Sequence, residues 1–386
     1  MEMTIAFYSS IVLLAIILFI GVSKRPQTEA TFFDRVTTKE LQGFFAFFII
    51  FHHIVINLED PATQAHEMVN FYYYGILAIA FYFFCSGFGL LKRWMTDKSY
   101  LKGFMKKRVF TVLVPYFICN YIYLTTALIS NLKYGFHFTF PELIGRFFGF
   151  FLINNEMWFA VEIMILYFAF KIIFEKVRKP LTGIILMTAV VALLMTIGLL
   201  SGHSEYTAMS YWFKGEWWYN TILMFPLGMI YAYKEERINR VIRKAFVSLT
   251  ILTSVLLVIV DYIHRELIAI NIFWTEFENP NHIWDKLKGL SVEIVLEILF
   301  LLLVLLILSK IRINNRVLKF LGKISLEIVM TNYLVISLLY PVLQKHGILV
   351  FIPTVIVGTL ICSAILYAIK NIVLERKTNF FDGKVQ

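Results

Sequence analysis

The sequence predicts an all-α membrane protein, a polytopic bundle of about eleven transmembrane helices. Of its 386 residues, 59% are hydrophobic and only 16% are charged, and the mean hydropathy is +0.73. A soluble domain carries about a quarter charged residues, so lipid is expected to be the main solvent of this chain. The apolar residues also come in runs of about 20, the length that crosses the hydrocarbon core of a bilayer as a helix.

The first apolar run, residues 4–22, is expected to be a retained anchor helix. Glu2 precedes the run, whereas Lys24 and Arg25 follow it. A cleaved secretory signal has the opposite polarity, with basic residues before the apolar run and a small-residue cleavage site after it. The order of charges therefore favours a helix that stays in the membrane with its amino end outside.

Ten further runs follow, and each is expected to form one transmembrane helix. The second run of the chain, 40–57, is short and polar in places, so its ends are the least well defined. The segment 138–157 is also fairly apolar and is a candidate for a re-entrant or interfacial stretch. The other expected spans are 71–91, 109–130, 158–174, 181–200, 217–233, 245–263, 289–309, 324–343 and 348–369.

The basic residues predict how the chain is oriented and divided. One set of alternate loops holds 29 of the 36 Lys and Arg residues, and loops rich in these residues face the cytoplasm. With eleven spans, this rule places the C-terminus in the cytoplasm and the N-terminus outside. We expect one membrane domain at 36–370, preceded by an anchor helix and cytoplasmic linker at 1–35 and followed by a cytoplasmic tail at 371–386.

Several classes of function find no support in the sequence. The net charge of +10 resides in loops between apolar runs, without a nucleic-acid fold signature, so no nucleic-acid partner is expected. Cys85, Cys119 and Cys362 all lie within apolar runs and lack C-x-x-C spacing, so neither a disulfide nor a metal site is expected. The chain also lacks a Walker loop, a G-x-S-x-G elbow, an H-E-x-x-H motif and a dinucleotide fingerprint.

The second apolar run carries the clearest candidate for chemistry, the adjacent His52 and His53. Polar groups inside a bilayer are costly, so each is a functional hypothesis. At 1.5 Å per residue, the helix from Glu40 to His53 is about 20 Å long, which places both histidines past the middle of the membrane. A buried imidazole can accept a proton from a hydroxyl and return it. The alternative is that both histidines merely bond backbone or water near an interface.

The same run resembles the first motif of the acyltransferase 3 family of membrane acyltransferases. Members of that family show a Leu-Arg-Gly run and a histidine eleven positions after the arginine. Here residues 41–43 are Leu-Gln-Gly, and His53 stands eleven positions after Gln42. The resemblance implies that His53 is the general base, with Gln42 and His52 in the substrate-binding region. Gln42 departs from the pattern, because it lacks the fixed positive charge of arginine.

Two further motifs match in the family's order. Residues 83–90, Phe-Phe-Cys-Ser-Gly-Phe-Gly-Leu, are similar to its Phe-Phe-x-x-Ser-Gly-Phe pattern, which implies substrate binding by Ser86. Small residues here also suit helix packing, in which Gly87 and Gly89 let another backbone approach closely, and both interpretations stay open. The basic run Phe-Met-Lys-Lys-Arg at 104–108 is similar to the family's Phe-x-x-x-Arg, and Arg108 coincides with its arginine.

The resemblance and the charge of this basic run imply donor binding at a cytoplasmic mouth. Lys106, Lys107 and Arg108 are expected to bind the phosphates of coenzyme A. The rule that cytoplasmic loops are basic would by itself also account for these charges.

The last two motifs lie near residues 158 and 325. Trp158, Glu162 and Tyr167 are similar to the family's Trp-x-x-x-Glu-x-x-x-x-Tyr segment, which implies a catalytic role for Glu162 and substrate binding by the two aromatic residues. Ser325 belongs to a Leu-Gly-x-x-Ser run, and Asn332 stands where relatives often carry a histidine. Both are expected to bind substrate, although an amide cannot shuttle protons at neutral pH.

The resemblance covers roughly residues 35–370 and implies an O-acetyltransferase-like enzyme of a bacterial cell membrane. It would transfer an acyl group, acetyl by resemblance, from acyl-CoA to a hydroxyl of a cell-surface or lipid-linked saccharide. Acyl-CoA would be a substrate, so no permanently bound cofactor is expected, and the expected partners are the acyl-CoA, the saccharide and membrane lipid.

Two alternatives from other classes stay open. A transporter or flippase for a lipid-linked saccharide would use intramembrane polar residues as a binding or proton path, and Glu293 and Glu297 share one helical face. A relative that has lost catalysis is the other alternative, because Gln42 and Asn332 both depart from the family pattern. Only a transferase requires a coenzyme A derivative.

Overall fold

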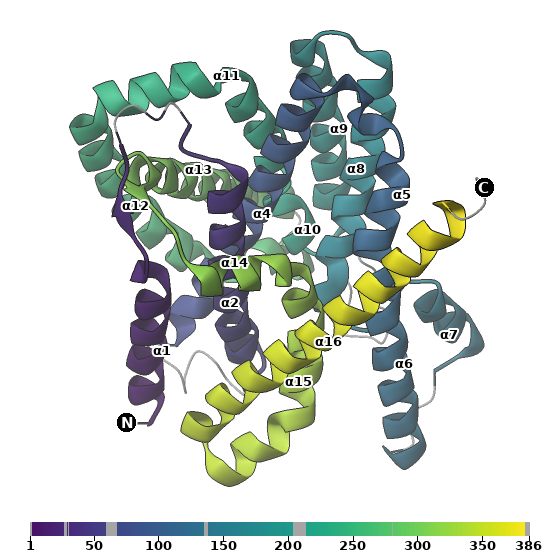
Figure 1. The fold of residues 1–386 in the computed structure, drawn as a ribbon. Helices are drawn as coiled ribbons and strands as arrows, with labels where there is room; N and C mark the ends of the chain where they lie inside the picture. The colour runs from purple at the N-terminus through teal and green to yellow at the C-terminus, as the bar shows by residue number, and fades with distance from the viewer. Residues whose placement is uncertain are drawn as a thin grey trace.

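The computed structural model describes residues 2–26, 29, 31–58, 68–134, 138–203, 214–279 and 281–382, and 84% of the chain is helical (Figure 1). The elements of the first half are α1 Glu2–Phe19, β1 Ser23–Lys24, α2 Arg35–Ile56, α4 Val69–Thr96, η1 Lys98–Leu101, α5 Phe104–Arg108, the π-helix η2 Val109–Leu113, α6 Val114–Tyr134, α7 Phe140–Phe147, η3 Asn155–Met157, α8 Trp158–Lys176 and α9 Pro180–Ser201. Those of the second half are α10 Trp217–Asn220, α11 Met224–Lys244, α12 Phe246–Ala269, η4 Ile272–Phe277, α13 His282–Leu308, β2 Ile311–Arg312, α14 Arg316–Lys323, α15 Ser325–His346 and α16 Ile348–Asp382.

Ten helices among the described residues are long and apolar enough to span a membrane, which confirms the predicted polytopic all-α bundle. The run at 217–233 differs from the expectation, because it is not one helix. α10 ends at Asn220, α11 begins at Met224, and non-helical backbone at Lys234 bends α11 before it continues to Lys244. The break after Asn220 and the charged second half of α11 explain why this run does not form a single long apolar helix. Of the predicted tail, residues 383–386 lie outside the described residues.

Helix α2 lies in the middle of the bundle and packs against α4, α14 and α15 (Figure 1). Its backbone meets that of α14 at two glycines. A Cβ atom on Gly322 would lie 1.9 Å from the carbonyl oxygen of Lys39, and one on Gly43 would lie 2.2 Å from that of Leu318. Only glycine permits this approach. The glycines of the first and last motifs therefore fix α2 against the short helix that precedes α15.

The predicted close approach at the second motif is confirmed at one of its two glycines. A Cβ atom on Gly87 of α4 would lie 1.9 Å from the carbonyl oxygen of Phe225 on α11. At Gly89 the prediction is wrong, because a Cβ atom there would meet nothing within 4 Å. The physical reason is the helical repeat, since two positions along a helix point to different faces.

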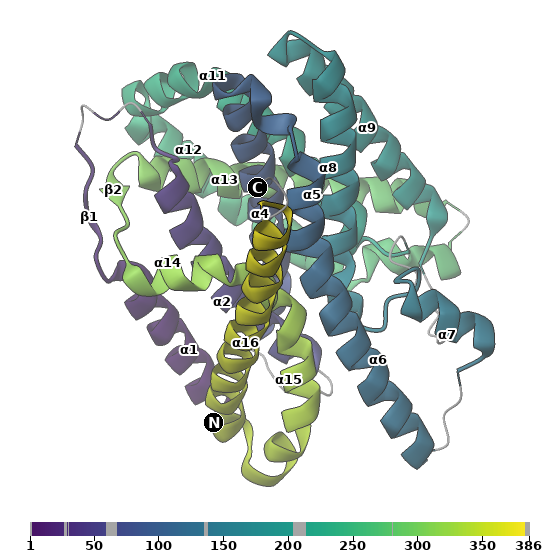
Figure 2. The same cartoon turned by 45° about the vertical axis from the view of Figure 1, so that its right-hand side comes forward.

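The N-terminal helix is joined to a late part of the chain. β1 pairs antiparallel with β2, with Ser23 opposite Arg312, at the edge of the molecule seen in Figure 2. The buried Arg25 donates from Nε to the carbonyl oxygen of Leu308 at 2.6 Å and from Nη2 to that of Phe32 at 3.2 Å. These bonds hold Arg25 and Phe32 against the end of α13, while α1 packs against α16, α2 and α14.

Helix α8 connects two regions of the molecule, one at its first turn and one at its last. Its neighbours are α5 and α9, which lie beside it in Figures 1 and 2. The 19 residues of α8 extend over about 28 Å. Its first turn, at Trp158, follows η3, and its last turn, at Lys176, leads into α9. Whatever binds at the two ends of α8 is therefore separated by most of the thickness of a bilayer.

Candidate active site

A cavity of about 300 Å³ opens at the first turn of α8, with both predicted histidines in its lining. Its walls come from α2, α4, η3, α8, α10, α12, α13 and α15, so segments from all along the chain meet here. The lining is aromatic and polar as well as aliphatic. It includes Tyr72, Tyr73, Trp158 and Trp217. A concave site with a few convergent polar groups is the usual form of a substrate-binding site.

The imidazole of the buried His53 lies between two polar side chains. Its Nδ1 is 2.9 Å from Oδ1 of Asn332, and its Nε2 is 2.8 Å from Oε2 of Glu156. An amide oxygen only accepts hydrogen bonds, so Nδ1 of His53 carries the proton and donates to Asn332. Nε2 then shares a second proton with the carboxylate of Glu156, and it becomes a base when this proton has left the pair. The predicted residues His53 and Asn332 are thus brought into direct contact.

Glu156 was missed by the sequence analysis, which singled out Glu162 instead. It lies on η3, two residues before the Trp158 that begins the fourth motif, and the side chain of Asn154 accepts from its backbone N–H at 3.0 Å. Glu156 lines the cavity. The available signal was the polar run Asn-Asn-Glu at 154–156 at the end of an otherwise apolar stretch.

The structure does not bring Glu162 to this cavity. Its side chain is fully buried, it is absent from the cavity lining, and its two carboxylate oxygens have no hydrogen-bond partner among the described residues. The carboxylate that contacts the imidazole of His53 is that of Glu156. The catalytic role predicted for Glu162 therefore has no geometric support and rests on the resemblance alone.

Two other predicted residues, His52 and Trp158, lie on the cavity wall. Nδ1 of His52 is 2.9 Å from the carbonyl oxygen of Phe71, and the ring stacks on Tyr72. A hydrogen bond to the backbone is what the alternative to a role in proton transfer predicted for this histidine. The indole of Trp158 packs against Phe83 and lines the cavity. Both histidines therefore face the cavity, but only His53 contacts other side chains that can hold or orient a proton.

A second cluster joins predicted residues of three different motifs, about halfway along α8. The hydroxyl of Ser86 on α4 donates to that of Tyr167 on α8 at 3.0 Å. The guanidinium of Arg108, on α5, lies 4.6 Å from the centre of the Tyr167 ring, and its Nη2 donates to the hydroxyl of Tyr100 at 2.9 Å. Nε of Arg108 has no partner among the described residues.

The other predicted residues lie elsewhere. Lys106 and Lys107 are exposed next to Arg108 on α5. Gln42 and Ser325 lie near the crossing of α2 with α14. The backbone carbonyl of Gln42 accepts from the hydroxyl of Tyr82 at 2.6 Å, and the hydroxyl of Ser325 donates to a backbone carbonyl at 3.3 Å. Neither residue lines the His53 cavity, and the substrate-binding roles predicted for these two residues stay predictions.

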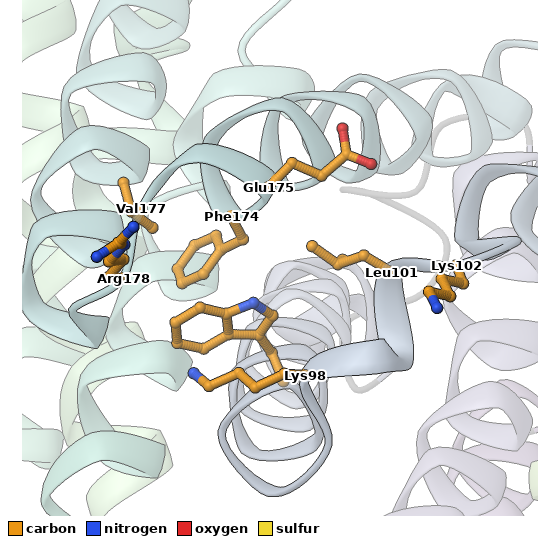
Figure 3. A pocket seen from close by; sticks show the side chains of 8 residues that line it. Lys98, Leu101, Lys102, Phe174, Glu175, Val177 and Arg178 are labelled. Carbon is orange, nitrogen blue, oxygen red and sulfur yellow. The ribbon is translucent and has the colours of Figure 1, made fainter.

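A basic hollow of about 420 Å³ lies at the opposite end of α8 (Figure 3). Its lining includes Trp94, Lys98, Lys102, Phe174 and Arg178. Nζ of Lys98 lies 3.1 Å from the centre of the Trp94 ring. Figure 3 shows Lys98 and Arg178 toward one end of the hollow and Lys102 at the other. The lining also includes Glu175, which pairs with Lys171 outside the hollow at 3.0 Å. Three cations against this one paired carboxylate favour an anionic ligand, above all a phosphate.

The described residues contain no group of three or more His, Cys, Asp or Glu that is arranged to hold a metal ion. A pair of a histidine and a carboxylate, with the other ring nitrogen held by an amide, is suited to removing a proton from a hydroxyl.

The comparison with known proteins agrees with the motifs. The model of the acyltransferase 3 family, an acyltransferase domain, matches residues 41–368. The match begins in α2 just before Gln42 and ends in α16, so it includes both His53 and Asn332. No curated protein and no solved structure matches the chain.

Proposed function

The chain belongs to the acyltransferase 3 family of membrane acyltransferases, and we propose that it transfers an acetyl group from acetyl-CoA to a hydroxyl of a cell-surface or lipid-linked saccharide. The observation that carries this proposal is the contact of His53 with both Glu156 and Asn332 on the wall of a cavity. A general base needs hydrogen-bond reach of the proton it removes and a partner that stabilises its protonated form. Nε2 of His53 has both.

The proposed reaction follows from this arrangement. In the neutral form of the ring, an acceptor hydroxyl takes the place of the Glu156 oxygen at Nε2. Nε2 takes the proton of this hydroxyl, and the hydroxyl oxygen attacks the thioester carbonyl. Glu156 stabilises the imidazolium that forms, while Asn332 keeps the ring in one orientation. When the C–S bond breaks, the sulfur of coenzyme A leaves with the electron pair and recovers the proton from His53. The products are an O-acyl ester and free coenzyme A.

The donor is expected to enter at the other end of α8. The basic hollow with Lys98, Lys102 and Arg178 suits the phosphates of coenzyme A. Arg108 and Tyr167 lie between this hollow and the His53 cavity, where a flexible acyl-carrying arm would pass. Lys106 and Lys107, the exposed lysines of α5 that were predicted to bind coenzyme A, would add to the positive potential that attracts an anionic donor.

The predicted orientation agrees with this two-sided arrangement. The loops expected in the cytoplasm contain Lys98 and Arg178, whereas those expected outside contain Glu156 and Glu216. We propose that the C-terminus is cytoplasmic and the N-terminus lies outside, with the acceptor arriving from outside. This orientation requires eleven crossings, so α10 and the first half of α11 are proposed to cross the membrane together, in addition to the ten long helices. A bacterial cell membrane is the proposed location.

Transport remains the competing function, and one observation favours it. Nδ2 of Asn220 donates to Glu293 at 3.1 Å, and Nε2 of His264 lies 3.4 Å from the same carboxylate on the cavity wall. Glu297, one turn further along α13, is fully buried. Such a row of polar groups inside a bundle is also what a proton-coupled transporter requires.

The deciding experiment is a measurement of acetyl-CoA binding and turnover by the full-length protein in nanodiscs. The transferase proposal predicts saturable binding and release of free coenzyme A thiol when a glycoside is added. His53→Ala should reduce release to a low residual rate and leave binding intact, whereas Glu236→Gln, an exposed change on α11, should alter neither. Absence of binding by folded protein at millimolar acetyl-CoA would contradict the proposal and favour transport.

A further inference from the structure

The cavity holds a second carboxylate whose position is fixed from behind, that of Glu216. Glu216 lines the cavity just before α10, and its side chain is 25% exposed. Its Oε2 is 2.5 Å from Nε2 of His203, whose side chain is only 1% exposed. Oε2 of Glu216 is thus hydrogen-bonded to a buried histidine. Oε1 of Glu216 has no hydrogen-bond partner among the described residues.

A buried network orients His203 and thereby Glu216. Nδ1 of His203 is 2.9 Å from Oε1 of Glu276, and the backbone N–H of His203 donates to the same oxygen at 2.5 Å. Glu276 also pairs with the buried Lys286, and the ring of Trp274 stacks on the imidazole with 3.9 Å between the centres. Every polar atom of the imidazole is therefore held, so Glu216 has little freedom to turn away from the cavity.

Apart from its histidines, the only ionisable side chains on the cavity wall that carry a full charge at neutral pH are acidic, among the described residues. Glu156, Glu216 and Glu293 line it, and neither Lys nor Arg does so among the described residues. Carboxylates accept hydrogen bonds from hydroxyls, which sugars offer in abundance. A carboxylate or phosphate on the ligand would instead meet like charge with no cation to offset it. The aromatic rings of Tyr72 and Trp217 supply apolar surface for a ring of the ligand to lie on.

We propose that Glu216 binds the acceptor through a hydroxyl other than the one that is acylated, and that the cavity selects hydroxyl-rich rings without negative charge. This inference rests on the proposed transferase function, since it assigns the His53 cavity to the acceptor. Glu216 is a specificity residue held in place by His203, Glu276 and Lys286. It takes no part in proton transfer at His53.

The test uses two probes that differ only at C6, hexyl β-D-glucopyranoside and hexyl β-D-glucuronide. Their binding to full-length protein in nanodiscs is measured by calorimetry, and acyl transfer from acetyl-CoA to each is followed by mass spectrometry. We expect the uncharged glucoside to bind the unmodified protein at least tenfold more tightly than the glucuronide. Glu216→Gln should weaken glucoside binding about tenfold, because a hydrogen bond to a charged group is lost, and should narrow the preference for the glucoside.

Three controls separate specificity from general damage. Glu236→Gln makes the same chemical change on an exposed surface and should change neither binding constant. Glu216→Asp keeps the charge and should retain the preference for the glucoside, even if shortened reach weakens binding. At saturating glucoside, Glu216→Gln should keep a kcat within about threefold of the unmodified protein, so that the effect appears in KM.

The outcomes distinguish this inference from the proposed function. Equal affinities for the two probes in the unmodified protein, no binding of either probe, or a Glu216→Gln variant that behaves like Glu236→Gln would each overturn the inference. In those cases acetyl-CoA turnover that depends on His53 would leave the proposed function standing. Preferential glucoside binding that needs Glu216, without any transfer from acetyl-CoA, would support the inference about the acceptor cavity and refute the transferase.

Discussion

The contact between Glu156 and His53 gives the sharpest prediction. Glu156→Gln preserves the size of the side chain but replaces a charged acceptor, 2.8 Å from Nε2, by a neutral amide. The negative charge matters most after the imidazole has taken a proton from the acceptor. We therefore expect kcat to fall while KM for both substrates changes little, because the lost interaction belongs to the transition state rather than to the bound ground state.

The size of the effect follows from the contact and its burial. The two side chains are only 6% and 18% exposed, so water screens their interaction weakly. A hydrogen bond to a charged group contributes about 1.5–3 kcal/mol. Since about 1.4 kcal/mol corresponds to a factor of ten in rate, kcat should fall roughly 10- to 150-fold. Complete loss of activity would exceed this range and would indicate that Glu156 is itself indispensable for proton removal.

The assay compares initial rates of coenzyme A release in nanodiscs, with hexyl β-D-glucopyranoside as acceptor. The unmodified protein, Glu156→Gln, His53→Ala and the variant with both changes form a double-mutant cycle. Glu236→Gln is the control for the loss of a carboxylate charge elsewhere on the protein. If Glu156 acts through His53, the double variant should be no slower than His53→Ala alone. A fall of less than threefold in Glu156→Gln, or a further tenfold loss in the double variant, would refute the reasoning.

Three further predictions concern the partners, the packing and the donor. Asn332→Leu removes the acceptor that fixes the ring, so kcat should fall about two- to tenfold, the worth of one neutral hydrogen bond, as the coenzyme A assay would record. Gly322→Ala forces a methyl group against the backbone of α2 and should destabilise the protein by about 1–3 kcal/mol, seen as a lower thermal unfolding midpoint, whereas Gly89→Ala, whose Cβ meets nothing, should not. Combined Lys98→Ala and Arg178→Ala should raise KM for acetyl-CoA about fivefold at low salt and less at high salt, and an unchanged KM would exclude the basic hollow as the donor site.

The sequence predicted the membrane bundle well because its signals are local. Apolar runs of sufficient length and a biased distribution of charge are both visible along the chain, so ten spans were found near their structural positions. The exception is 217–233, where an apolar run predicted one helix but the chain breaks after Asn220 and then runs into the charged second half of α11. A window of hydropathy cannot detect the break between Asn220 and Met224, which depends on how Trp218 and Tyr219 are buried by neighbouring helices.

The candidate site was predicted in part, for a different reason. Motif spacing identified His53 and Asn332, but it carried no information that the two would touch across α2 and α15. Glu156 escaped notice because it lies outside the spans, in a short helix whose fold is set by local capping. Glu162 was chosen because it matches the glutamate of a family motif, and motif spacing does not reveal which other side chains a residue contacts.

The pairing of β1 with β2 also has a consequence for how the protein is made. Ser23 and Arg312 are adjacent in the folded molecule but are synthesised far apart in time. The first membrane helix is therefore inserted long before its strand partner is synthesised, and β1 can pair with β2 only after α13 has left the ribosome. Contacts between such distant parts of a chain form late in folding. Premature termination before β2 would leave α1 with its contacts to α2 but without the strand pairing and without α14 and α16, so we expect quality-control proteases to recognise incomplete chains at this end.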